Sequence, residues 1–328
     1  MSRTGFLAAI DPRQASRPTA YGSGTSIACR ELMTQIGVGF PEAHLDAEKM
    51  AALALAGHTV LGFDVVAPLF SVCHEATAMG CNVNWGGPNQ MPESGKPIFH
   101  ELDDIRIPAD LLKRPGCAVP LRAIGLLKKR LDDAAAVCGK VFGSWTQAYH
   151  YFGVERFLMG ALDDADATRR ILDRLLPVTI AFAAAQIEAG ADCILLADHA
   201  TRDLCGPRMY EQYLVPLHRR LAEEIKAPVI LHICGNTSDR IGMIAQTNLA
   251  CFHWDTKTGA SAEVRRLAGP RLALMGGISN YKLLRATPAE IAADSAAAAR
   301  AGINVVGPEC AIALGTPLAN LLAIVPSP

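Results

Sequence analysis

The chain has 328 residues, 50% of them hydrophobic, and its 31 basic side chains nearly balance its 32 acidic ones. Such a chain can bury a large core, while the lack of a basic excess argues against a nucleic-acid surface, and no apolar run reaches the roughly 18 residues of a membrane span. Scattered cysteines and a start without an apolar signal region indicate reduced thiols and a cytoplasmic protein.

The first third of the chain contains two predicted strands and one long irregular segment. After a short amphipathic lead-in over residues 1–17, strands are predicted within residues 18–27 and 63–69, separated by an Ala-rich helix over residues 46–61. Residues 81–108, rich in Gly, Pro and Asn, show no regular period. They predict a long loop excursion of the kind that often forms a lid or a binding loop.

From there on, helices and strands alternate regularly. Further strands are predicted over residues 140–145, 193–198, 228–234, 249–255, 271–278 and 303–307. The helices predicted between them cover residues 109–137, 165–189, 208–226, 238–246, 260–267 and 288–301. Eight β/α units in one chain of this length predict a TIM (β/α)8 barrel with a short N-terminal helical extension.

The main alternative fold is a doubly wound sheet, but the glycine-rich dinucleotide turn expected after its first strand is missing. No low-complexity linker divides the sequence. Residues 1–328 are therefore expected to form one domain.

One predicted strand ends in two residues of metal-ligand type. His232 and Cys234 lie two apart, so their side chains point to the same side of the strand. Imidazole and thiolate are zinc ligands, yet a buried Cys is often only core packing, so the pair alone favours a metal about evenly. Cys310 leaves the last predicted strand at the face where barrel active sites lie. The three residues together predict a zinc site with an open fourth position.

Three acidic residues at or after predicted strand ends are candidate catalytic groups. Asp255 is expected either to orient His232 or to cap the helix that follows. Asp198 is expected to have a polar role at the barrel mouth. Glu75 is expected to line the mouth, to act as an acid, or to cap the next helix.

An open zinc site with two thiolate ligands favours thiol chemistry. The thiolates donate charge to the ion and weaken it as an activator of water. The ion can still bind an incoming thiol, lower its pKa and keep it as a nucleophilic thiolate. Methylation of a thiol is therefore predicted ahead of hydrolysis.

The stretch His232-Ile233-Cys234-Gly235-Asn236-Thr237 with the distant Cys310 resembles the His-x-Cys…Cys zinc motif of methylcobamide:coenzyme M methyltransferases, in the uroporphyrinogen decarboxylase-like superfamily. The similarity covers nearly the whole chain and includes the segments 41–44, 46–50, 75–81, 307–310 and 316–318. It implies a TIM barrel, one zinc ion, and transfer of a methyl group from the cobalt of a corrinoid protein to a zinc-bound thiol such as coenzyme M. Glu309 stands where this family is expected to have glycine, a departure that concerns the shape of the pocket.

Under this resemblance, three further residues are candidate contacts to the corrinoid ring or the thiol. Ser144 follows a predicted strand, and Gly276 and Gly277 would let a ligand approach the backbone, although a tight loop explains the two glycines as well. The partners implied are a corrinoid protein that carries methylcobamide and a small thiol.

Other functions remain open alternatives. The chain could demethylate a methoxy or methylamine donor onto a corrinoid protein, or use tetrahydrofolate as acceptor. Uroporphyrinogen decarboxylase itself is less favoured, because it is metal-free and has an arginine-rich N-terminal signature. The matching region here, residues 21–30, contains a single arginine, Arg30. A corrinoid-binding or zinc-storage module without turnover would need a fourth protein ligand.

Overall fold

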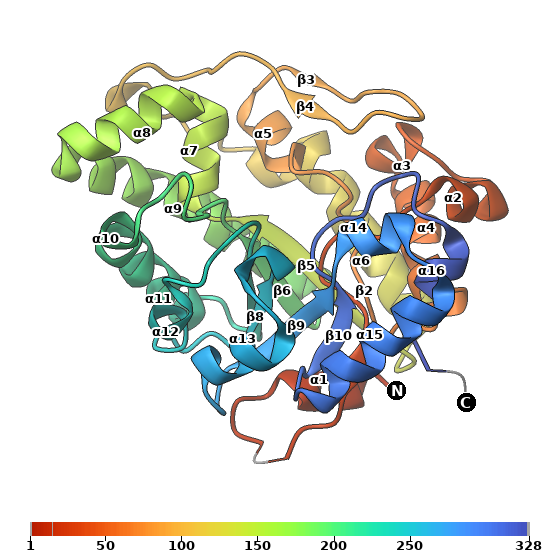
Figure 1. The fold of residues 1–328 in the computed structure, drawn as a ribbon. Coiled ribbons are helices and arrows are strands. Elements are labelled where there is room, and N and C mark those ends of the chain that lie inside the picture. Colours follow the sequence, from red (N-terminus) through yellow and green to blue (C-terminus); the bar gives the residue numbers. More distant parts are fainter. Residues whose placement is uncertain (1, 15, 327–328) are drawn as a thin grey trace.

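The computed structural model describes residues 2–14 and 16–326. In this part of the chain eight parallel strands form one sheet, ordered β1-β10-β9-β8-β7-β6-β5-β2. A parallel bridge between Gly22 and Val65 joins its two ends into a barrel (Figure 1), which confirms the predicted (β/α)8 fold. The barrel strands are β1 (Ala20–Tyr21), β2 (Val65–Val66), β5 (Ala136–Phe142), β6 (Cys193–Ala197), β7 (Val229–Ile233), β8 (Cys251–Trp254), β9 (Ala273–Ile278) and β10 (Val305–Pro308).

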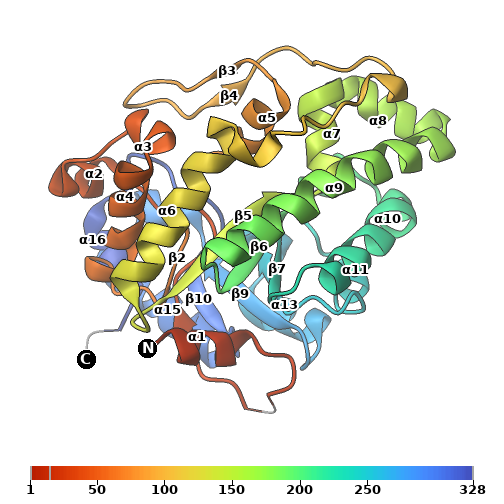
Figure 2. The ribbon, with the colours of Figure 1, turned by 180° about the vertical axis from the view of Figure 1, so that it is seen from behind.

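Helices surround the strands on the outside of the barrel, as Figures 1 and 2 show from opposite sides. The α-helices are α1 (Arg3–Ile10), α2 (Arg30–Ile36), α3 (Glu42–Leu45), α4 (Ala47–Thr59), α5 (His74–Met79), α6 (Pro115–Leu131), α7 (Ser144–Phe152), α8 (Val154–Asp163), α9 (Ala165–Ala189), α10 (Pro207–Met209), α11 (Val215–Glu224), α12 (Ile241–Ile244), α13 (Ser261–Ala268), α14 (Asn280–Arg285), α15 (Pro288–Arg300) and α16 (Leu318–Leu322). Shorter turns are η1 (Leu102–Asp104), η2 (Leu111–Lys113), the π-helical η3 (Tyr210–Leu214) and η4 (Thr256–Thr258). None of the described helices is long and apolar enough to cross a membrane.

The N-terminal helix α1 closes one end of the barrel. Figures 1 and 2 show α1 at this end of the barrel. Its Phe6, Ala9 and Ile10 are fully buried against side chains from the barrel interior. The interior residues of this cluster are Ala20, Val65, Ala67, Ala136, Cys138, Cys193, Leu195, Ile230, Cys251, Ala273, Met275 and Val305. Because small and branched apolar side chains fill this end, a cavity can form only toward the other end of the strands.

The boundary before β5 differs from the prediction. The Ala-rich run before Cys138 predicts helix, but α6 ends at Leu131, and Asp132 has a positive φ of 50°. The following residues enter the barrel wall, where every residue of β5 is buried. The strand also ends earlier than the predicted residues 140–145, because Ser144 is the first residue of helix α7.

Helices α7 and α8 were not predicted at all. Nearly every residue of α7 is buried, so the helix lacks the polar face that makes a 3.6-residue period visible in a sequence.

The loop excursion over residues 81–108 contains a short antiparallel ribbon of β3 (Val83–Asn84) and β4 (Glu93–Ser94). Figures 1 and 2 show this ribbon passing over the end of the barrel opposite α1. Ser94 Oγ lies 2.7 Å from His150 Nδ1 of α7, and the Trp85 ring packs against His74 with the centroids 5.2 Å apart. The excursion is thus joined to helices at the open end of the barrel.

Candidate metal centre

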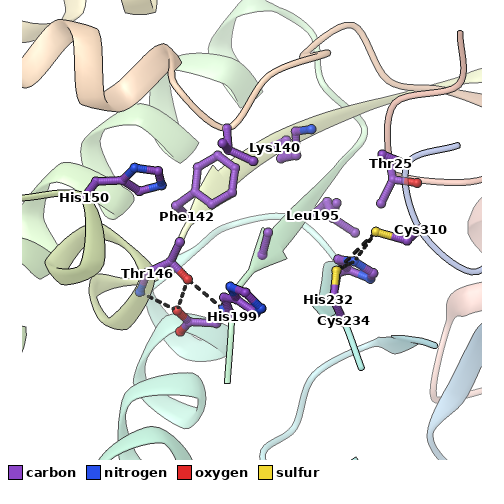
Figure 3. A pocket seen from close by; sticks show the side chains of 14 residues that line it. Thr25, Lys140, Phe142, Thr146, His150, Leu195, His199, His232, Cys234 and Cys310 are labelled. Atoms are coloured by element: carbon purple, nitrogen blue, oxygen red, sulfur yellow. Dashed lines mark hydrogen bonds between the residues drawn. The ribbon is translucent and has the colours of Figure 1, made fainter. Parts of the chain in front are cut away.

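Three side chains meet at the open end of the barrel. His232 belongs to β7, Cys234 follows that strand, and Cys310 lies just beyond β10. His232 Nε2 is 3.0 Å from Cys234 Sγ and 3.4 Å from Cys310 Sγ, and the two sulfurs are 3.1 Å apart (Figure 3). The structure therefore brings together the three residues that the sequence predicts as metal ligands.

The three donor atoms suit a zinc ion. Within the described residues they form the one group of His, Cys, Asp or Glu side chains with metal-ligand spacing, and the atoms lie within 4.8 Å of one another. Tetrahedral zinc would place sulfurs about 3.8 Å apart, and sulfur and nitrogen about 3.6 Å apart. Small outward movements of the three side chains would accommodate the ion, and no fourth His, Cys, Asp or Glu ligand joins them among the described residues.

The charges of the two thiols are coupled. A hydrogen bond with Cys234, together with the proximity of His232, holds the pKa of Cys310 well below its usual range. The same sulfur–sulfur contact, together with burial, raises the pKa of Cys234, because a second negative charge would lie beside the first. A divalent cation removes this repulsion, so the pair is suited to bind a metal as two thiolates.

A backbone carbonyl orients the imidazole of His232. Its Nδ1 lies 3.2 Å from the carbonyl oxygen of His253, which can only accept a hydrogen bond. The proton is therefore placed on Nδ1, and the Nε2 lone pair is free to face the two sulfurs.

Two carboxylates hold the loops that present the ligands. Asp255 accepts hydrogen bonds from the N–H groups of Gly235 (2.8 Å) and Lys257 (2.9 Å), so it fixes the residue after Cys234 and caps η4. The contact that orients His232 comes from His253 and not from Asp255. Glu309 accepts from the N–H of Thr256 (2.8 Å) and of Asn280 (2.7 Å). It joins the loops after β8 and β9 to the segment that carries Cys310.

The three ligands lie at one side of a cavity of about 350 Å³. Figure 3 shows Lys140, Phe142 and His150 on other parts of its wall, and His199 beside Thr146. The lining residues are Thr25, Val72, Lys140, Phe142, Thr146, His150, Leu195, Ala197, Asp198, His199, His232, Cys234, Cys310 and Ala311. Val72 at this cavity is 44% exposed, so the cavity reaches the molecular surface.

Asp198, the predicted polar residue after β6, lies in the cavity wall with both carboxylate oxygens in use. Oδ1 accepts from the Thr146 N–H (3.0 Å) and hydroxyl (2.9 Å), and Oδ2 lies 3.0 Å from His218 Nε2. Tyr210 Oη lies 3.0 Å from His218 Nδ1 and extends this buried network. Asp198 thus positions the start of α7 beside the cavity.

Four other residues that the sequence predicts for the site lie outside the cavity: Glu75, Ser144, Gly276 and Gly277. Glu75 is buried on α5, where its carboxylate accepts the N–H of Phe142 (3.1 Å). Ser144 is fully buried and its Oγ has no hydrogen-bond partner among the described residues. A Cβ at Gly276 would meet the Trp254 carbonyl at 2.8 Å, so strand packing accounts for that glycine.

Gly277 has a φ of +95° and faces Ala298 of α15, outside the barrel. It borders a separate hollow between α13 and α15, and does not contact the metal centre.

Lys140 is the cavity residue that the sequence argument passed over. It is 6% exposed on β5 and continues the inward-facing series of Ala136 and Cys138. A lysine within an otherwise apolar strand is the signal that could have identified it. His199 also lines the cavity, and its backbone N–H donates a hydrogen bond to Thr146 Oγ1 (2.7 Å).

Comparison with known proteins gives consistent matches over the whole chain. The sequence profile of the uroporphyrinogen decarboxylase (URO-D) family matches residues 1–327. The methylcobamide:CoM methyltransferase MtaA of Methanosarcina barkeri is 32% identical over 327 residues, which is 98% of this chain and 96% of that protein. The methylated-thiol–coenzyme M methyltransferase of Methanosarcina mazei is 32% identical over 297 residues, 90% of this chain and 80% of that protein. A solved methyltransferase structure from Methanosarcina mazei superimposes with a TM-score of 0.94 at 31% identity, and covers 98% of this chain and 96% of that one.

Proposed function

The chain belongs to the uroporphyrinogen decarboxylase family, and on this basis we propose that it is a methyltransferase that moves a methyl group from methylcobamide to a thiol bound at zinc. The observation that carries the proposal is the meeting of His232 Nε2, Cys234 Sγ and Cys310 Sγ within 3.4 Å of one another at an open cavity. The relatives named above, which span the chain almost completely, support the choice of methylcobamide as donor and of a small thiol as acceptor. We further propose that the whole chain acts as one catalytic domain, because β7 and β10, which present the ligands, belong to one sheet.

When bound, a zinc ion with two thiolate ligands would keep a substrate thiol deprotonated and nucleophilic near neutral pH. The protein contributes the geometry of its three ligands. His253 sets the tautomer of His232, while Asp255 and Glu309 hold the loops next to Cys234 and Cys310. These contacts orient the donor atoms before the substrate arrives, which lowers the cost of reaching the reactive arrangement.

The transfer balances as a nucleophilic displacement. The thiol loses its proton, and an electron pair on its sulfur forms the new sulfur–carbon bond to the methyl group. The cobalt–carbon bond breaks with both electrons remaining on cobalt, so methyl-cob(III)alamin becomes cob(I)alamin. The partly exposed Val72 and exposed Ala311 at the cavity provide an open rim where a corrinoid presented by a partner protein could approach.

The composition of the cavity disfavours decarboxylation of a substrate with many carboxylates. Its lining contains one lysine and no arginine, whereas such a substrate needs several cations. The open metal position likewise disfavours a storage module without turnover, because three protein ligands leave zinc incomplete.

The decisive experiment combines metal analysis with a spectroscopic assay. We expect one zinc per chain and conversion of methylcobalamin to cob(I)alamin upon addition of 2-mercaptoethanesulfonate. X-ray absorption at the zinc edge should show one additional sulfur ligand when the thiol is added. A metal coordination that stays unchanged with thiol, or methyl transfer at full rate in the zinc-free protein, would contradict the proposal. Transfer to tetrahydrofolate, or demethylation of a methoxy or methylamine donor, would identify the alternative acceptor or direction.

A further inference from the structure

A buried lysine lies in the same cavity as the metal centre. The side chain of Lys140 comes from the inner face of β5, and its Nζ donates a hydrogen bond to Ser26 Oγ at 3.2 Å. The Ser26 hydroxyl in turn donates to the carbonyl oxygen of Leu69 at 2.7 Å. An ammonium group has three N–H donors, so most of the hydrogen-bonding capacity of Lys140 remains available to a ligand.

No carboxylate is paired with Lys140 among the described residues. Among the described residues no carboxylate oxygen lies within 4.0 Å of Nζ, and Ser26 is its one hydrogen-bond partner. The groups whose charges act on Lys140 are the thiols of Cys310, Cys138 and Cys234 and, after them, the carboxyl of Glu75. Burial raises the pKa of Glu75 to about 8, so this carboxyl is mostly neutral at pH 7. Burial keeps the nearby His44 neutral as well, since it lowers the pKa of that side chain to about 4.

The filled metal centre would not supply the missing charge either. A divalent ion, two thiolates and a neutral imidazole sum to no net charge. A cation that is buried without a partner is costly, and the cost falls when an anion binds. The free donors of Lys140 therefore form one half of an anion site, which shares its cavity with the open metal position.

We propose that Lys140, which Ser26 holds in place, binds the anionic group of the acceptor thiol while the sulfur of that thiol occupies the open position at His232, Cys234 and Cys310. This inference rests on the proposed function and narrows the acceptor to small thiols that carry a sulfonate, carboxylate or phosphate group. Lys140 would then select the substrate and orient its sulfur toward the methyl donor.

Lys257 is the rival cation near the metal centre. Its charge acts on Cys234, but the side chain is exposed on η4 and is not part of the cavity lining. Because water and salt screen an exposed charge, Lys257 is a weaker candidate and a matched control.

The test compares the binding of charged and uncharged thiols to the zinc-loaded protein by isothermal titration calorimetry. Lys140→Gln should weaken binding of 2-mercaptoethanesulfonate by about 10- to 100-fold, the range for a hydrogen bond to a charged group. Binding of 2-mercaptoethanol should change by less than about threefold, and Lys257→Gln should leave both affinities within about twofold. The assignment would be overturned if Lys140→Gln lost the same affinity for both thiols. It would also be overturned if Lys257→Gln lost affinity for 2-mercaptoethanesulfonate alone.

A second arm uses the zinc-loaded protein and ethanesulfonate, which has no thiol. The wild type should bind ethanesulfonate, and both Lys140→Gln and Lys140→Met should lose this binding. The Met variant guards against a folding defect, because an apolar side chain of similar length often replaces a buried charge without loss of stability. Equal binding of ethanesulfonate to the wild type and the folded Met variant would contradict the proposal.

The two proposals fail in distinguishable ways. Binding of ethanesulfonate through Lys140 without methyl transfer to any thiol would support the anion site and refute the proposed function. Methyl transfer with the same preference between charged and uncharged thiols in the wild type and Lys140→Gln would refute the anion site and leave the proposed function standing.

Discussion

The Sγ atoms of Cys234 and Cys310 lie 3.1 Å apart, although 76 positions separate the two residues in the chain. The barrel brings them together, because β7 and β10 both end at the same open face. The contact between the two sulfurs lowers the pKa of Cys310 and raises that of Cys234, and a divalent ion would allow both sulfurs to bind as thiolates.

Replacement of Cys310 should remove the metal and the methyl transfer together. Cys310→Ala leaves only two protein ligands, so zinc affinity should fall by at least about 100-fold, beyond what loss of an outer contact usually causes. Metal analysis after dialysis against a chelator and the methylcobalamin assay measure the two losses. Cys117→Ala, at a buried cysteine of α6, should retain zinc. Full activity of the zinc-free Cys310→Ala protein would refute the role assigned to the centre.

Gly143 leaves the space that the Asp198 carboxylate occupies. A Cβ at this position would overlap Asp198 Oδ2, so Gly143→Ala should displace the carboxylate from Thr146 and His218. We expect a loss of about 2–4 kcal/mol in the free energy of unfolding, measured by urea denaturation, with reduced methyl transfer.

Gly160 provides the control for this substitution. It lies in helix α8 with no atom within 4 Å of an added Cβ. Gly160→Ala should therefore stabilise the protein by about 0.5–1 kcal/mol through helix propensity. A similar effect of both substitutions would show that the Asp198 contact is unimportant.

Anion binding should weaken as the pH rises through the pKa of Lys140. Burial lowers this pKa to about 8, and nearby Cys310 partly offsets the shift. The charged form binds the anion, so affinity is full below that pH and should fall about tenfold per pH unit above it. Titration of the zinc-loaded wild type with ethanesulfonate between about pH 6 and pH 10 measures the slope. The control variant Lys257→Gln should show the same fall of affinity with pH as the wild type. An affinity of the wild type that does not change with pH would contradict the assignment to Lys140.

Glu75 should make the protein less stable at alkaline pH. Burial raises its folded-state pKa from 4.5 to about 8, so its contribution to stability is full below pH 4.5 and is lost as the pH rises to about 8. Glu75→Gln keeps an oxygen that can accept the Phe142 N–H but cannot ionise. At about pH 9 the variant should exceed the wild type in free energy of unfolding by on the order of 2–4 kcal/mol.

The control for Glu75 is Glu155→Gln on the exposed surface of α8, which should leave the stability profile unchanged. Urea unfolding at several pH values compares the three proteins. Parallel profiles for wild type and Glu75→Gln would show that this carboxyl does not ionise differently in the folded state.

Local patterns predicted most of the barrel but not its irregular parts. The strands β6 to β10 are short apolar runs between helices, and both neighbours of each run reinforce its assignment. Helix α7 was missed because it is buried nearly all round. Strand β5 began earlier than predicted because the alanines at residues 134–136, before and at its start, favour helix in isolation. In both cases burial in the assembled barrel outweighed the local preference.

Sequence alone determined the alternation of strands and helices and the chemistry of the metal ligands. The spacing of His232 and Cys234 places both on one side of a strand, whatever the rest of the molecule does. Cys310 joins them once the order of the strands is known, because all parallel strands of a barrel end at one face.

Only the tertiary structure decided which of the remaining polar residues reach the cavity. Glu75, Ser144 and Gly276 were as plausible in sequence as Lys140, but Glu75 and Ser144 are buried behind the cavity wall and Gly276 packs against a neighbouring strand. Lys140 instead points inward, because residue parity along β5 and the closure of the barrel select its direction. The direction in which a side chain points and its burial depend on contacts between segments far apart in the chain. A local sequence pattern does not contain those contacts.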